Sequence, residues 1–205
     1  MSPGNAAVVI PIRSFEAGKS RLGTELDAAR RAELLRTMAA NVVAAAGSMP
    51  VAVVSNAAEV RAWAAALRLT VLDDPGSLDL AAVAGLGWAA AAGFDRVVVA
   101  HADLPLATTL APVAADGRRP IVTAVPCHRD DGTPVLSLPT TATHFVFAYG
   151  PGSFRRHAAA ARAAGLAFRV RRDGRLGRDV DAPEDLVGLP APLRGLGRRR
   201  ALLGA

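Results

Sequence analysis

The sequence contains little cysteine, few aromatic residues and almost no lysine, and each scarcity narrows what the protein can be. One cysteine, Cys127, stands among 205 residues, so no disulfide framework is available within the chain and a cytoplasmic protein is expected. Aromatic residues make up 4%, so the core must consist mainly of alanine, valine and leucine. Because Tyr149 is the one tyrosine, we expect no row of aromatic platforms for nucleic-acid bases.

Long apolar runs are also missing. No run approaches the roughly 20 residues that a membrane span needs, and the first residues, MSPGNAAVVIPI, lack the basic region and cleavage site of a signal peptide. With 51% hydrophobic and 20% charged residues, the composition is typical of a folded domain. We predict one domain over residues 1–190, a basic, flexible tail at 191–205, and no membrane contact.

The charge that is present is mainly positive. The net charge is +6, and eight arginines against one acid lie between residues 155 and 178. A basic balance suits either nucleic acid or a small polyanionic substrate. Because no nucleic-acid-binding motif accompanies it, we expect a small anion and no nucleic-acid partner.

Short β-branched runs alternate with alanine-rich helical segments along the chain. Alternation at this spacing is typical of a parallel sheet covered by helices on both faces. Asn56 with Glu59 resembles a capping arrangement for the second helix. We predict one α/β domain with a mixed, mostly parallel sheet. The expected strands are 6–12, 51–55, 69–74, 96–100, 120–127, 134–138, 144–149 and 166–172, and the expected helices are 25–46, 56–67, 78–92 and 152–164.

The one lysine, Lys19, lies in SFEAGKSRLG, residues 14–23. GKS suggests a Walker A loop, but Arg13 stands where that motif needs its first glycine. The loop still follows the first strand and precedes a helix, where ligands of open α/β sheets bind. Lysine is a compact charge that the wide arginine fork does not replace at a crowded phosphate. We therefore predict that Arg13, Lys19 and Arg21 surround one phosphate-sized opening; the alternative is that the lone lysine is an accident of composition.

Aspartates mark two further segments of the sequence. Asp103 comes after the buried run VVVA, at the carboxyl end of a central strand, where it could hold a divalent cation or cap a short helix. His101 beside it is better explained as a satisfied loop histidine. Asp179 and Asp181 are two residues apart, so on an extended segment both side chains point to one side and suit Mg²⁺. The alternative for Asp181 is a helix N-cap.

YGPGSF, residues 149–154, opens the arginine-rich helix. Pro151 is expected in the first turn, where its missing N–H costs nothing. Gly152 and Ser153 would then offer free N–H groups and a hydroxyl to an anion. The turn DDGTPVL adds the hydroxyl of Thr133. We predict an anion-binding cradle here.

Five segments occur in this order: IPIRSFEAGKSRL, HADLPL, GT, YGPGSF with a histidine three residues on, and DVDAPEDL. Together, over residues 8–188, they resemble the guanylyltransferases of deazaflavin coenzyme (coenzyme F-420) biosynthesis. The resemblance implies a Rossmann-like nucleotidyltransferase that joins GMP from GTP to phosphoenolpyruvate or 2-phospho-L-lactate and releases pyrophosphate. Its product would pass to the next enzyme of the pathway. The site residues that it implies are, for Mg²⁺, Asp103, Asp179 and Asp181, and, for the phospho-acid, Thr133, Gly150 and Ser153.

The chain departs from the family pattern at two places. Pro134 follows GT where the family often has asparagine, and Leu78-Asp79 stands where the family often has Leu-Asn. Two alternatives stay open. One is another nucleotidyltransferase, for molybdopterin or sugar phosphates, although these usually carry a GG.S.RMG loop that is missing here. The other is a non-catalytic nucleotide-binding protein, which leaves the three aspartates unexplained.

Overall fold

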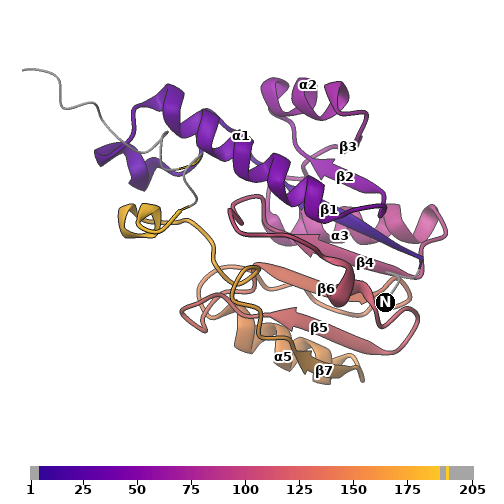
Figure 1. Ribbon diagram of the computed structural model, residues 1–205. Helices are drawn as coiled ribbons and strands as arrows, with labels where there is room; N and C mark the ends of the chain where they lie inside the picture. The colour runs from indigo at the N-terminus through magenta and orange to yellow at the C-terminus, as the bar shows by residue number, and fades with distance from the viewer. Residues whose placement is uncertain (1–4, 190–192, 194–205) are drawn as a thin grey trace, which may run out of the picture.

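The computed structural model describes residues 5–189 and 193, which form one α/β unit around a sheet (Figure 1). The strand order in the sheet is β3-β2-β1-β4-β6-β5-β7. β6 runs antiparallel to β4 and β5, while the other neighbouring pairs are parallel. The predicted mixed, mostly parallel sheet is therefore confirmed. The strands are β1 (Ala6–Pro11), β2 (Val51–Val54), β3 (Thr70–Leu72), β4 (Arg96–Ala100), β5 (Ile121–Val125), β6 (Val135–Pro139) and β7 (Ala167–Val170).

Helices cover both faces of the sheet, and α1 passes in front of it in Figure 1. The core on that face contains buried residues of α1, α2 and α4, and the core on the other face contains residues of α3 and α5. The helices are α1 (Ala28–Ala45), α2 (Ala58–Ala66), α3 (Leu78–Ala91), α4 (Ala111–Ala114) and α5 (Ser153–Ala163), with short 3-10 helices η1 (Ser20–Thr24) and η2 (Pro183–Leu186).

The central strand β1 shows how small residues build this core. Val8 and Ile10 pack toward the α1 face and Val9 toward the α3 face, all fully buried. A Cβ added at Gly85 of α3 would come within 2.4 Å of the Val9 side chain. The helix can therefore lie this close to the sheet only because residue 85 has no side chain.

The segment 144–149 is not a strand, contrary to its alternating pattern. Its three aromatic side chains are buried as alternation requires, but its N–H groups have partners outside any strand ladder. Ala148 N–H donates to the ring of His157, and Tyr149 N–H donates to Asp79. Burial of every second residue shows only that one face of the segment is packed. A strand also needs a neighbouring strand with which its backbone can pair.

The predicted cap at Asn56 is also wrong. Helix α2 begins after Ala57, which makes no side-chain cap, and Asn56 instead exchanges two hydrogen bonds with the backbone of Asp74. Glu59 accepts hydrogen bonds from the hydroxyl of Ser14 and from the backbone N–H of Phe15. Both polar groups therefore fix loops at the carboxyl edge of the sheet.

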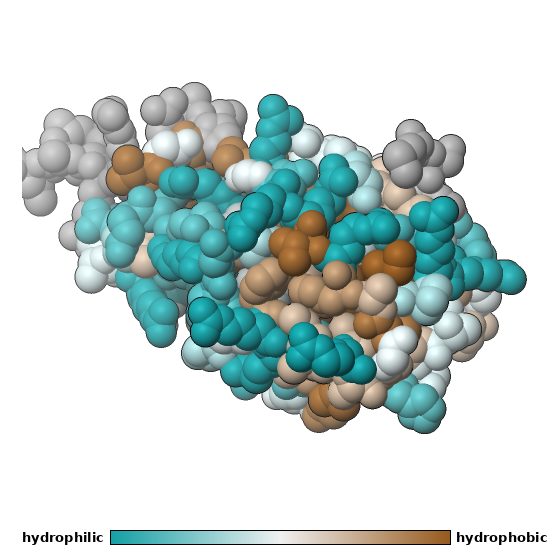
Figure 2. All heavy atoms as spheres, turned by 90° about the horizontal axis from the view of Figure 1, so that it is seen from below, coloured by the Kyte–Doolittle hydropathy of each residue, from teal (hydrophilic) through white to brown (hydrophobic). Residues whose placement is uncertain are grey.

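The remaining predictions on the fold concern the tail and the membrane. Most of the predicted tail at 191–205 lies outside the described residues, and its described member, Leu193, is buried in the core. Within residues 5–189 and 193, no helix is both long and apolar enough to cross a bilayer. The view from below shows hydrophilic side chains around a smaller apolar area (Figure 2).

Candidate active site

Two cavities open at the carboxyl edge of the parallel strands. The first cavity, of about 290 Å³, lies between the loop after β1, the start of α3 and the loop after β4. The second cavity, of about 470 Å³, includes Thr133 and Ser153 in its lining. Lys19, His101 and Asp103 line both cavities. The two cavities therefore meet at these three residues.

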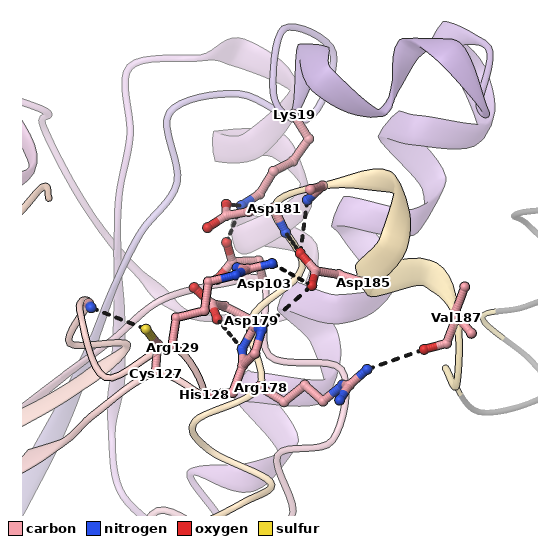
Figure 3. A network of polar contacts seen from close by, with 12 residues as sticks. Lys19, Asp103, Cys127, His128, Arg129, Arg178, Asp179, Asp181, Asp185 and Val187 are labelled. Atoms are coloured by element: carbon pink, nitrogen blue, oxygen red, sulfur yellow. Dashed lines mark hydrogen bonds and ion pairs between the residues drawn. The ribbon is translucent and has the colours of Figure 1, made fainter.

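An ammonium lies between two carboxylates at this junction (Figure 3). Lys19 Nζ forms ion pairs with Asp103 and with Asp181 Oδ1, and the three side chains are 18%, 13% and 45% exposed. Burial alone would lower the pKa of Lys19, but the two carboxylates outweigh it and hold the pKa above its ordinary value. The same contact lowers the pKa of Asp181 against the opposing effect of burial. Two aspartates thus hold the lysine ammonium at the junction of the two cavities.

The third aspartate, Asp179, is the most deeply buried of the set. Burial, and then the charges of Asp103 and Asp181, raise the pKa of its carboxyl. In the described part of the chain, Asp103 Oδ1 and Asp179 Oδ1 are buried without a hydrogen-bond donor, although His128 Nδ1 lies 3.3 Å from the latter. Buried oxygens without donors beside a cluster of negative charge are what a divalent cation would relieve.

No group of three His, Cys, Asp or Glu side chains within residues 5–189 and 193 stands close enough to hold a metal ion as placed. The Lys19 ammonium lies between Asp103 and Asp181, two of the three predicted ligands. The predicted metal role of the three aspartates therefore stays a prediction.

The extended segment around Val180 brings two of the aspartates to the second cavity. Val180 is fully buried and its N–H donates to the carbonyl of Asp103, so Asp179 and Asp181 flank it and both line the cavity. The expected same-side arrangement is present. Asp181 is not an N-cap, because Ala182 holds that position before η2. Nor does Asp103 cap a helix, because none begins directly after it.

Asp185 is a site residue that the sequence analysis missed. It is 4% exposed, and its Oδ2 accepts the N–H groups of Asp181 and Ala182, each at 2.9 Å. Its other oxygen lies 2.9 Å from the Arg129 guanidinium. Burial would raise the pKa of Asp185, but the two N–H groups and Arg129 lower it. Asp185 stands in the first turn of η2, where it accepts the N–H of the N-cap residue Ala182. Its spacing of four residues from Asp181 was the available signal for its link to the site.

The backbone at Lys19 has a left-handed conformation, with φ of 52°. A non-glycine residue in that region costs roughly 1–2 kcal/mol. The preceding carbonyl, of Gly18, accepts a hydrogen bond from Arg31 of α1. This turn directs the lysine from the loop after β1 to the aspartates, and strained residues are common at functional sites.

The three predicted cations do not surround one opening. Arg13 lines the first cavity and Arg21 the second, and Lys19 is common to both. Arg21 lies within the 3-10 helix η1, whereas Arg13 lies in the loop before it. Their spacing in the sequence could not show that they line different cavities.

The predicted cradle also differs in its donors. Gly152 N–H donates to Asp131 at 2.8 Å and Ser153 N–H to the carbonyl of Gly150 at 3.0 Å, so neither N–H is free. Pro151 precedes the helix, whose N-cap is Gly152. The hydroxyls of Ser153 and Thr133 remain, 3.4 Å apart. The cradle therefore offers hydroxyl groups rather than the amide pair that its sequence suggested.

Arg156 shapes the loop that carries Gly150. Its guanidinium donates to the carbonyls of Ala148, Tyr149 and Pro151. Because carbonyl and N–H point in opposite directions across a trans peptide, the N–H of Gly150 points away from Arg156. Within the described chain this N–H donates to no group, which leaves it available to a ligand.

Comparison with known proteins identifies the family. The family described as "Guanylyl transferase CofC like" matches residues 6–197. The phosphoenolpyruvate guanylyltransferase of Rubrobacter xylanophilus is 35% identical over 89% of this chain and 92% of its own. The 2-phospho-L-lactate guanylyltransferase of Methanothermobacter thermautotrophicus is 31% identical, over 87% and 81%. The 3-phospho-D-glycerate guanylyltransferase of Phenylobacterium zucineum is 31% identical, over 89% and 88%.

Solved structures agree on the fold. A nucleotidyl transferase from Methanothermobacter thermautotrophicus superposes with a TM-score of 0.63 at 16% identity, over 93% of this chain and 98% of its own. At that identity the likeness shows the α/β fold alone.

Proposed function

This chain belongs to the CofC-like guanylyl transferase family, and we propose that it transfers GMP from GTP to phosphoenolpyruvate and releases pyrophosphate in coenzyme F-420 biosynthesis. A cytoplasmic location and handover of the product to the next enzyme are parts of the proposal. The lone Cys127 supports the first of these.

The observation that carries the proposal is the meeting of the two cavities at Lys19, His101 and Asp103. A transferase with two substrates needs two sites whose reacting groups meet. GTP would occupy the first cavity, with its phosphates toward the junction. The phospho-acid would occupy the second cavity, with its phosphate at the same point.

The reaction joins two anions. A phosphate oxygen of the acid attacks the α-phosphorus of GTP, a new P–O–P bridge forms, and the bond to pyrophosphate breaks. A phosphate monoester has its second pKa near 6 and is mostly a dianion at neutral pH. The nucleophile therefore needs no general base, and the protein's task is to position the groups and stabilise charge.

Asp103, Asp179 and Asp181 would hold Mg²⁺. The two buried oxygens without donors and the raised pKa of Asp179 support this fit. When bound, the ion supplies charge neutralisation at the phosphates and at the leaving pyrophosphate. The three cations divide between the substrates: Arg13 faces GTP, Arg21 faces the phospho-acid, and Lys19 stands between them.

The choice of acid follows from the second cavity. Phosphoenolpyruvate and 2-phospho-L-lactate carry carboxylate and phosphate on one carbon, so their anionic groups lie close together. Thr133 and Ser153 present two hydroxyls 3.4 Å apart, and Gly150 adds one N–H. Such a compact donor set suits a short ligand better than 3-phospho-D-glycerate, and the 35% identical relative named for phosphoenolpyruvate favours that acid.

The test is a kinetic comparison of three acids. We would incubate the protein with GTP, Mg²⁺ and phosphoenolpyruvate, 2-phospho-L-lactate or 3-phospho-D-glycerate, and measure pyrophosphate. We expect kcat/KM at least tenfold higher for phosphoenolpyruvate, about 1.4 kcal/mol of discrimination. A tenfold higher kcat/KM for either other acid would overturn the choice of substrate. Absence of pyrophosphate with all three acids would overturn the proposed function.

A further inference from the structure

His157 of α5 lies directly behind the phospho-acid side of the second cavity. It is fully buried, and its ring packs against Tyr149 at 4.8 Å and Phe145 at 6.0 Å between centroids. Both ring nitrogens have partners. Ala148 N–H donates to Nε2 at 3.0 Å, and Nδ1 lies 3.1 Å from Thr133 Oγ1.

The partners of the ring determine where its proton lies. A backbone N–H can only donate, so Nε2 must be the unprotonated, accepting nitrogen. In the neutral ring the proton is then on Nδ1, which faces Thr133. Burial, followed by the charges of Arg156 and His101, lowers the pKa of His157 to about 4, so the ring is neutral at physiological pH.

This tautomer sets the direction of the hydrogen bonds that follow. Nδ1–H donates to Thr133 Oγ1, so the hydrogen of the Thr133 hydroxyl cannot point to the histidine. That hydroxyl and the one on Ser153, 3.4 Å apart, then share two hydrogens. Whichever hydroxyl donates to the other, one hydrogen is left for the cavity, and an anion can only accept.

We propose that His157 is a positioning residue that fixes the Thr133–Ser153 hydroxyl pair as a donor toward the phospho-acid. The inference rests on the proposed function, because it assigns the anion in the second cavity to that substrate. With the opposite tautomer, Nδ1 would accept the Thr133 hydrogen, and the one remaining hydrogen, on Ser153, would have to serve either Thr133 or the anion. Ala148 N–H prevents this, which gives a functional reason for its lying outside the sheet.

Two substitutions of His157 test the roles of its two ring nitrogens separately. The amide of asparagine in His157→Asn can place an N–H near Nδ1 and keep a donor to Thr133. The longer His157→Gln can place its carbonyl near Nε2 and keep the acceptor for Ala148, without the donor. If His157 only supported the loop, glutamine would be the better replacement. If His157 acts through Thr133, asparagine would be the better replacement.

The measurement is KM for the phospho-acid and for GTP, with kcat, in wild type and both variants. Loss of one hydrogen bond to a charged ligand is worth about tenfold in affinity or more, so we expect KM for the acid to rise about tenfold in His157→Gln. In His157→Asn we expect a rise of about threefold or less, and in both variants KM for GTP within about twofold. Thermal melting checks that each variant is folded.

A coupling test removes the remaining ambiguity. In a Thr133→Val background, His157→Gln should raise KM for the acid about twofold or less, because the hydroxyl through which it acts is gone. Equal KM values for the asparagine and glutamine variants, or an undiminished effect in Thr133→Val, would refute the inference while leaving the proposed function intact. Absence of transfer by the wild type would refute the proposed function and, with it, this role for the histidine.

Discussion

Replacing Lys19 by methionine tests whether its ammonium and a metal ion bind the same carboxylates. The ammonium pairs with Asp103 and Asp181, beside the buried Asp179. Lys19→Met keeps most of the stem and removes the charge, so three carboxylates face each other. Lys19→Arg is the matched control that keeps the charge but brings a wide fork to the same turn.

The expected magnitude lies between two limits. Breaking a fully buried pair costs about 3–5 kcal/mol, and an exposed pair is worth about 0–1 kcal/mol. Lys19 is 18% exposed but Asp181 is 45% exposed, so the contribution must be discounted for solvent screening. We take about 2 kcal/mol, which corresponds to a Tm about 4–8 °C lower for a domain of this size.

Melting curves with and without Mg²⁺ measure the competition. In EDTA we expect Lys19→Met to melt about 4–8 °C below wild type, because it loses about 2 kcal/mol of stability. Saturating Mg²⁺ should raise the Tm of Lys19→Met more than that of wild type, since the ion no longer displaces an ammonium. Lys19→Arg should keep most of the stability in EDTA but lose most activity. The same Mg²⁺ shift in wild type and Lys19→Met would refute the idea that lysine and metal share these oxygens.

Three further outcomes follow from the site. Asp103→Asn should retain less than about a tenth of the activity at saturating Mg²⁺ while the protein stays folded; higher activity would argue against a metal ligand. Ser153→Ala should raise KM for the acid more than KM for GTP, and an effect on GTP alone would misplace the cradle. The pKa of His157 is held near 4 against about 6.5 unfolded, so its contribution to stability is present above pH 6.5 and lost as pH falls toward 4. Wild type should therefore lose about 2 kcal/mol more than His157→Asn between pH 7.5 and 5 in urea unfolding; parallel losses would contradict the neutral buried ring.

The sequence was sufficient for elements whose pattern and packing agree. β4 was predicted over its full length, because a run of β-branched residues buried on both faces has few other conformations. The carboxyl-edge position of Asp103 followed from that strand. Both features are local, because the period and the length of the apolar run in the sequence are enough to predict them.

Contacts between distant segments could not be predicted in the same way. The segment 144–149 has the burial of a strand, but its partners are His157 and Asp79, on two different helices. Asp185 caps the first turn of η2, but its hydrogen bond from Asp181 and its contact with Arg129 depend on how the chain turns after the last strand. In each case a polar side chain replaces backbone pairing, and no local pattern reports that.

The reversed direction of β6 has a consequence for how substrate preference could change in evolution. Because β6 is antiparallel to β4, its beginning rather than its end lies beside His101, whose N–H donates to the carbonyl of Pro134. Thr133 is therefore tied to a strand register and not to a free loop. A two-residue slip would keep every side chain on its face yet carry Thr133 about 7 Å along the strand, away from its place in the second cavity. Under the proposed function, we therefore expect new acid preferences to arise by exchange of side chains around the second cavity rather than by a shift of β6.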